Sequence, residues 1–106
     1  QFESLCVRDL RVYAEAIDGT VFHYRDKTGL EADAVIVLAD GRWAPIEVKL
    51  GSRQLDEAAA HLRRLRERVD ANRMGEPSFL AVVTAGATPY RRDDGVLVVP
   101  LACLRP

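Results

Sequence analysis

The chain has 106 residues, of which 48% are hydrophobic, 29% charged and 7% aromatic, and its formal net charge is -1. This composition fits one globular domain with a single core and excludes a disordered tail. The longest uncharged stretch, 77–90, is too short and too polar for a membrane span, so we expect no membrane association. Cys6 and Cys103 lie outside any CxxC pattern, which argues against a disulfide framework or a zinc site and favours a reducing, cytoplasmic location.

The first predicted element is a helix that ends before Gly19. Its apolar residues recur at spacings of three and four: Phe2, Leu5, Cys6, Leu10, Tyr13 and Ile17. The chain starts inside this helix and does not begin with Met. We therefore expect residues 1–106 to be a single domain of a longer protein.

Three strands are predicted next, over 20–24, 30–38 and 43–50, because these runs are rich in β-branched, aromatic and alternating residues. A polar turn ending in Gly29 separates the first two strands. Residues 39–41 have the Asp-Gly chemistry of a tight hairpin between the second and third.

A second helix is predicted over 53–73, with Ser52 as its cap and one apolar stripe along its length. A continuous apolar run over 79–84 predicts a central strand buried on both faces. A last strand over 96–99 and a short terminal helix over 100–104 complete the chain. The expected fold is α/β, in the order α-β-β-β-α-β-β, with a mixed central sheet flanked by helices.

Several nucleotide-binding and catalytic motifs are missing. No two of the seven glycines have the spacing of GxGxxG or of a P-loop, and no serine nucleophile elbow occurs. His23 and His61 are isolated in the sequence, and we expect both to be strand or surface histidines.

One group of residues carries chemistry, and it lies on the hairpin formed by the second and third strands. If the apolar faces of these strands match, directly opposed residues have numbers that sum to an even value. A three-residue loop over 39–41, with Gly41 left-handed, gives the sum 80 and places Asp33 opposite Glu47. A bulge near Pro45 would serve as well.

Two opposed carboxylates on a half-buried sheet face repel each other unless a cation or a proton neutralises them. Oxygen ligands of this kind suit Mg²⁺ or Mn²⁺. Lys49, two residues beyond Glu47, would stabilise charge on a phosphoryl transition state. The alternative is a cross-strand salt-bridge cluster of Asp33, Glu47 and Lys49, which the spacing alone favours.

These residues also resemble a known family. An Asp on one strand, Ile46-Glu47-Val48-Lys49 on the next and a helix after them are similar to the PD-(D/E)xK (restriction-endonuclease-like) nuclease superfamily. More narrowly, the chain resembles the domain of unknown function that closes many prokaryotic ATPases of the AAA+ type. The similar segments are Tyr24-Arg25-Asp26, Gly29 to Asp33, Pro45 to Lys49, Asp94-Gly95-Val96 and Val99-Pro100-Leu101. Ala32 replaces the family proline, and Ala58 replaces the tyrosine of RecB-like nucleases.

The resemblance implies roles for individual residues. Asp33 and Glu47 would bind Mg²⁺ or Mn²⁺ together with the carbonyl of Val48, and Lys49 would be the catalytic lysine. Glu3 matches an acidic residue on the first helix of many members; its alternative is an exposed first-turn acid. Glu31 would be a supporting acid or a substitute ligand. The implied activity is metal-dependent hydrolysis of DNA phosphodiesters beside an N-terminal ATPase domain.

The net charge gives no overall attraction to nucleic acid, but Arg63, Arg64 and Arg66 gather on the second predicted helix. They are candidate DNA contacts; a solvated arginine-rich face is the favoured alternative. Two further hypotheses remain open at this level. The domain would be a non-catalytic interaction or homo-oligomerisation module of a fused ATPase, or a nucleic-acid-binding module without hydrolysis.

Overall fold

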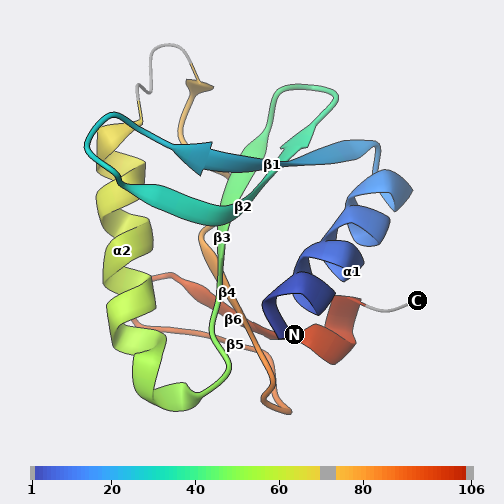
Figure 1. Ribbon diagram of the computed structural model, residues 1–106, viewed down its shortest axis with the longest axis vertical. Helices are drawn as coiled ribbons and strands as arrows, with labels where there is room; N and C mark the ends of the chain where they lie inside the picture. The colour runs from blue at the N-terminus through green and yellow to red at the C-terminus, as the bar shows by residue number, and fades with distance from the viewer. Residues whose placement is uncertain (1, 70–73, 105–106) are drawn as a thin grey trace.

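The computed structural model describes residues 2–69 and 74–104. A six-stranded mixed sheet forms its centre, with the strand order β1-β2-β3-β4-β6-β5. Helices α1 and α2 lie on opposite faces of this sheet (Figure 1). The elements in chain order are α1 (Phe2–Ala16), β1 (Gly19–Arg25), β2 (Glu31–Leu38), β3 (Trp43–Val48), η1 (Ser52–Gln54), α2 (Leu55–Arg68), β4 (Ala81–Thr84), β5 (Tyr90–Arg91), β6 (Leu97–Pro100) and η2 (Leu101–Leu104). The predicted mixed α/β class is confirmed.

Three details differ from the predicted elements. Strand β5 was missed, because two exposed residues carry no hydrophobic pattern. Helix α2 has Gln54, not Ser52, at its N-cap position, since a turn of 3₁₀ helix precedes it. Phe79 lies outside β4 and is exposed, so the buried run begins later than predicted. The predicted end of the second helix falls on 70–73, outside the described residues.

The hairpin of β2 and β3 has the register that the sequence predicts. Val37 pairs with Trp43 and Ala34 with Ile46, so opposed residues sum to 80. Gly41 closes the loop with a φ of 91°, a left-handed conformation that glycine adopts without steric cost. Pro45 fits this ladder without a bulge. It lies opposite Val35. Opposed pairs in an antiparallel ladder alternate between hydrogen-bonded and non-hydrogen-bonded, and Leu38 and Arg42 form a hydrogen-bonded pair. Val35 and Pro45, three pairs further along, therefore form a non-hydrogen-bonded pair.

Strand β2 contains one irregularity, and it lies at Asp33. The pairing of β1 with β2 shifts between Phe22 and Tyr24, so β2 holds one residue more than β1 there. Ala32 consequently packs on the same face as Val35, in one cluster with Leu65 of α2. The alternation predicted along the strand over 30–38 is therefore wrong at this point, because a bulge changes which way successive side chains face.

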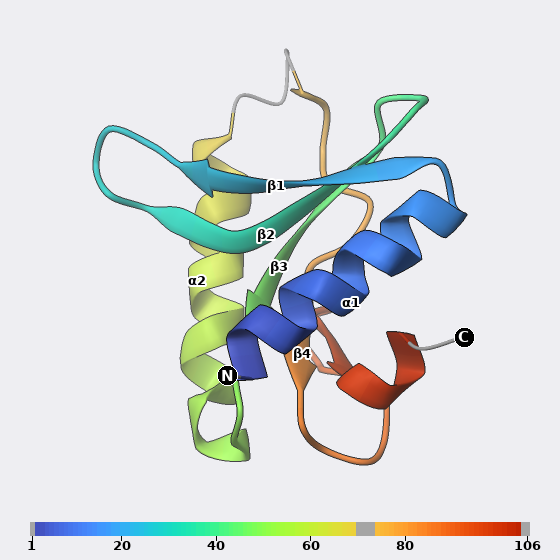
Figure 2. The same ribbon diagram turned by 45° about the vertical axis from the view of Figure 1, so that its right-hand side comes forward.

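The two faces of the sheet bury separate cores. Helix α1 packs Cys6 and Leu10 against even-numbered residues of β2 and β3 such as Ile36 and Ile46. Helix α2 packs on the other face, against β4, β6 and the odd-numbered face of β2 and β3 (Figure 2). Among the described residues, no helix combines the length and hydropathy needed to cross a bilayer. The α2 face is the one that carries the charged residues discussed next.

Candidate functional site

Asp33 and Glu47 meet where the β2–β3 ladder ends. The paired part of the hairpin stops at Ala34 and Ile46, and the next residue on each strand is one of the two acids. Glu47 Oε2 accepts the Asp33 backbone N–H at 3.2 Å, and Asp33 Oδ2 accepts the Val48 backbone N–H at 2.8 Å. These two side-chain bonds continue the ladder in place of backbone carbonyls. The predicted juxtaposition of the two acids is confirmed.

A polar pocket of about 310 Å³ opens at this point, between the ends of β2 and β3 and the side of α2. Its acidic side chains are Glu31, Asp33, Glu47 and Glu57, and its basic ones are Lys49, His61 and Arg64. Strand β4 fixes the position of Lys49, whose backbone N–H donates to the Val83 carbonyl at 3.0 Å. In the described part of the chain, neither Lys49 nor Arg64 forms an ion pair with a carboxylate.

Glu47 is the most perturbed carboxyl group of the pocket. It is only 7% exposed. Burial first, and then the hydrogen bond and negative charge of Asp33, raise the pKa of Glu47 to about 8, while the Asp33 N–H and Lys49 act in the opposite direction. Burial and the neighbouring acid therefore favour the protonated form of Glu47 when no cation is present.

Sequence reasoning missed His61. Its Nε2 lies 3.2 Å from Glu47 Oε1 and also contacts the backbone carbonyl oxygen of Glu31. Its Nδ1 lies 3.5 Å from Nη2 of Arg64, one turn further along α2. The only available signal was helical spacing, since Glu57, His61 and Arg64 share one side of a helix. His23 is exposed and faces the Glu31 carboxylate at 3.5 Å.

Two of the proposed acids lie at the margin of this site or outside it. Glu31 is exposed, and its side chain faces His23 at the rim of the pocket. Glu3 is exposed in the first turn of α1 and is not part of the pocket wall. Burial, then the charges of Asp9, Glu3 and Asp33, raise the pKa of the Cys6 thiol to about 11. Glu3 and Asp33 thus both raise the pKa of the Cys6 thiol, but of these two acids only Asp33 lines the pocket.

The three arginines of α2 have different surroundings. Arg63 forms an ion pair with Asp94 at the β5–β6 turn. Arg64 lines the acidic pocket. Arg66 is exposed and borders a separate hollow beside Arg91 and Asp94. Arg63 and Arg66 thus lie near Asp94, whereas Arg64 faces the acidic pocket.

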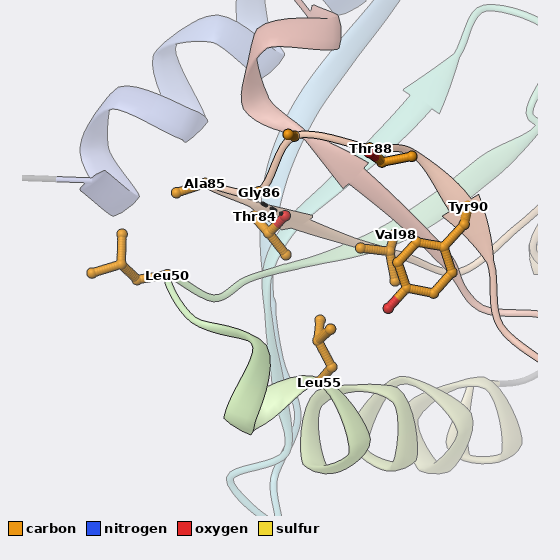
Figure 3. A pocket seen from close by; sticks show the side chains of 9 residues that line it. Leu50, Leu55, Thr84, Ala85, Gly86, Thr88, Tyr90 and Val98 are labelled. Atoms are coloured by element: carbon orange, nitrogen blue, oxygen red, sulfur yellow. Dashed lines mark hydrogen bonds between the residues drawn. The ribbon is translucent and has the colours of Figure 1, made fainter.

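A larger cavity, of about 460 Å³, is separate from this pocket and lies at the ends of β3 and β4 (Figure 3). Leu50, Leu55, Tyr90 and Val98 line it, and none of its lining side chains is charged. Thr84, at the end of β4, is satisfied locally because its hydroxyl accepts the Gly86 N–H at 3.2 Å. The charged pocket is therefore the better candidate for chemistry.

Across the described residues, no three His, Cys, Asp or Glu side chains are arranged to hold a metal ion by themselves. Two carboxylates still form a fitting partial set, since Mg²⁺ retains several waters and commonly uses only one or two carboxylates of the protein. The raised pKa of Glu47 is consistent with this set, because a cation beside the pair would offset the repulsion from Asp33.

The fold and this site define a mixed α/β domain in which a buried glutamate and a half-buried aspartate lie in one pocket with a lysine. The family model described as "Domain of unknown function (DUF4143)" matches residues 1–104. The chain therefore belongs to the DUF4143 family. No curated protein and no solved structure matches it.

Proposed function

We propose that this domain is a divalent-metal-dependent nuclease module that hydrolyses DNA phosphodiesters, attached to an ATPase. The observation that carries the proposal is the pair of acids, Asp33 and Glu47, beside Lys49. Each carboxyl group accepts a backbone N–H from the opposite strand: Glu47 from Asp33, and Asp33 from Val48. A purely structural salt-bridge cluster accounts for it less well. Lys49 forms no ion pair with either acid in the described chain, and the acids need a proton or a cation.

Mg²⁺ or Mn²⁺ would be held by Asp33 and Glu47, with the carbonyl of Val48 as the further ligand that the PD-(D/E)xK resemblance implies. Such an ion supplies Lewis acidity toward a phosphate and its attacking water. The pocket volume of about 310 Å³ leaves room for a phosphate group between the acids and the basic side chains.

The chain's own residues have separable roles in this proposal. Lys49 presents an ammonium to the negative charge that develops on the phosphate oxygens during attack. Arg64 presents its guanidinium to a phosphate from the opposite wall, on α2. Water adds to phosphorus, the bond from phosphorus to the leaving oxygen breaks, and that oxygen takes up a proton.

The test is cleavage of single-stranded and duplex DNA with Mg²⁺, Mn²⁺ or EDTA. We expect cleavage with either metal and none in EDTA. Lys49→Ala should lower the rate by about 100-fold or more. Arg11→Ala is the matched control, because it removes a cation from the exposed side of α1 on the other face of the sheet. A chain that neither cleaves DNA nor is stabilised by millimolar Mn²⁺ would contradict the proposal and favour a non-catalytic module.

A further inference from the structure

His61 links α2 to the ends of β2 and β3 at a single atom. Its Nε2 contacts two oxygens, Glu47 Oε1 at 3.2 Å and the backbone carbonyl of Glu31. The side chain is 21% exposed, so water competes poorly for these contacts. The contacts join residues 30 and 14 positions apart in the sequence, and no local motif produces them.

The partners of the ring determine where its proton lies. A backbone carbonyl can only accept a hydrogen bond, so Nε2 must carry a hydrogen. Nδ1 faces a guanidinium nitrogen of Arg64, which can only donate, and is therefore the acceptor of the ring. Both contacts select the neutral tautomer with hydrogen on Nε2. In this state Nε2 has no lone pair to offer a metal ion.

The same contact completes the hydrogen bonding of Glu47. Its Oε2 accepts the Asp33 N–H at 3.2 Å, and its Oε1 lies 3.2 Å from His61 Nε2. Groups on two different elements, β2 and α2, thus lie against the carboxyl group where β2 and β3 separate. Without His61, Asp33 alone would orient it among the residues that the structure describes.

We propose that His61 is a positioning residue, which orients the Glu47 carboxylate through its Nε2–H and does not itself ligate the metal. The consequence for metal binding rests on the proposed function, whereas the orientation of Glu47 does not. Groups that hydrogen-bond a ligating carboxylate commonly contribute about 10- to 100-fold to metal affinity or activity. Loss of the Nε2–H donor should weaken metal binding by a factor in this range.

Two substitutions separate the donor from the bulk of the ring. His61→Gln retains an N–H close to the position of Nε2, and His61→Leu retains volume without a donor. His23→Gln is the matched control, since it makes the same chemical change on an exposed strand. Rescue by glutamine but not by leucine distinguishes positioning from packing.

The first measurement needs no metal. Long-range ¹H–¹⁵N NMR of the imidazole should show hydrogen on Nε2 of His61, both alone and with Mg²⁺. The Asp33 amide should exchange with solvent at least about tenfold faster in His61→Leu, because its acceptor is no longer held. It should exchange near the wild-type rate in His61→Gln. A bare Nε2, or equal exchange in the wild type and His61→Leu, would overturn the proposal.

The second measurement is Mn²⁺ affinity, from the electron paramagnetic resonance signal of the free ion. We expect His61→Leu to bind about 10- to 100-fold more weakly than wild type, and His61→Gln and His23→Gln to bind normally. Equal affinity in the wild type and His61→Leu would overturn the positioning role and leave the nuclease proposal standing. A wild-type chain that binds no Mn²⁺ would contradict the nuclease proposal instead. Exchange of the Asp33 amide would then decide whether His61 orients Glu47.

Discussion

Helix α2 borders two groups of charged residues that differ in how their charges are matched. At the β5–β6 turn, Asp94 lies between Arg63 and Arg92, and Arg92 also reaches Asp56 at 2.9 Å. Where β2 and β3 separate, Asp33 and Glu47 lie together instead. Neither Lys49 nor Arg64 forms an ion pair with them in the described chain. In the first group, acidic and basic side chains pair with one another. The second needs a proton or a further cation, and the proposed function rests on this difference.

Asp94 shows what a matched arrangement does. Partial burial alone would raise its pKa, but the Val96 N–H, Arg92 and Arg63 hold the pKa below its usual value. Its Oδ1 also accepts the Val96 N–H at 3.1 Å, which closes the turn into β6. This carboxylate stays charged and joins α2 to the edge of the sheet.

The largest effect that we expect concerns pH and Glu47. A pKa of about 8 in the folded chain, against 4.5 for an ordinary glutamate, means that folding takes up a proton between these values. The stabilisation is complete below about pH 4.5 and is lost as the pH rises through about 8. The free energy of unfolding should fall by about 1 kcal/mol per pH unit in this window. Urea denaturation at several pH values measures it.

Glu47→Gln should remove this slope, because an amide does not titrate. Glu57→Gln, which removes an exposed carboxyl from the α2 wall of the same pocket, should keep it. A wild-type stability that does not change between pH 5 and about 8 would show that the acid pair is not proton-sharing, and would remove the contrast with Asp94.

Asp94→Ala should be the next largest change. It removes two ion pairs and leaves the N–H of the buried Val96 without its acceptor, at a cost of about 2 kcal/mol. Thermal unfolding checks it, with Asp93→Ala in the same turn as the control. Mn²⁺ should stabilise this variant as much as wild type. A lost metal response would mean that the two charged groups are coupled.

Asp33→Asn should have the opposite sign at the other group. The amide oxygen still accepts the Val48 N–H, while the like charge beside Glu47 disappears. We expect the metal-free chain to gain about 1 kcal/mol at pH 8. Stabilisation by Mn²⁺ should vanish. A variant less stable than wild type without metal would show that the pair does not repel.

The smallest effects separate the neighbouring Arg63 and Arg64. Arg63→Gln should lower stability by at most about 1 kcal/mol, since its partly exposed pair with Asp94 is lost. Arg64→Gln should leave stability unchanged but reduce the salt dependence of DNA binding by about one phosphate contact. Fluorescence anisotropy with labelled DNA at several salt concentrations measures this. Equal loss of binding in both variants would favour a diffuse basic face.

The sequence by itself determined the hairpin and the acid pair. Alternation of apolar residues over β2 and β3, together with a glycine suited to a left-handed loop position, predicts the register that buries both apolar faces. That register places Asp33 beside Glu47. These features depend on neighbours in the chain and on the two-residue period of a strand, which can be read directly.

Only the tertiary structure decided the rest of the site. The bulge in β2, which lies at Asp33, depends on pairing with β1, and the role of His61 depends on how α2 is rotated over the sheet. The different surroundings of Arg63 and Arg64 have the same origin, because adjacent residues on a helix project about 100° apart. Sequence spacing specifies those directions relative to the helix. Packing of α2 against β4 and β6 determines which residues each of these side chains contacts.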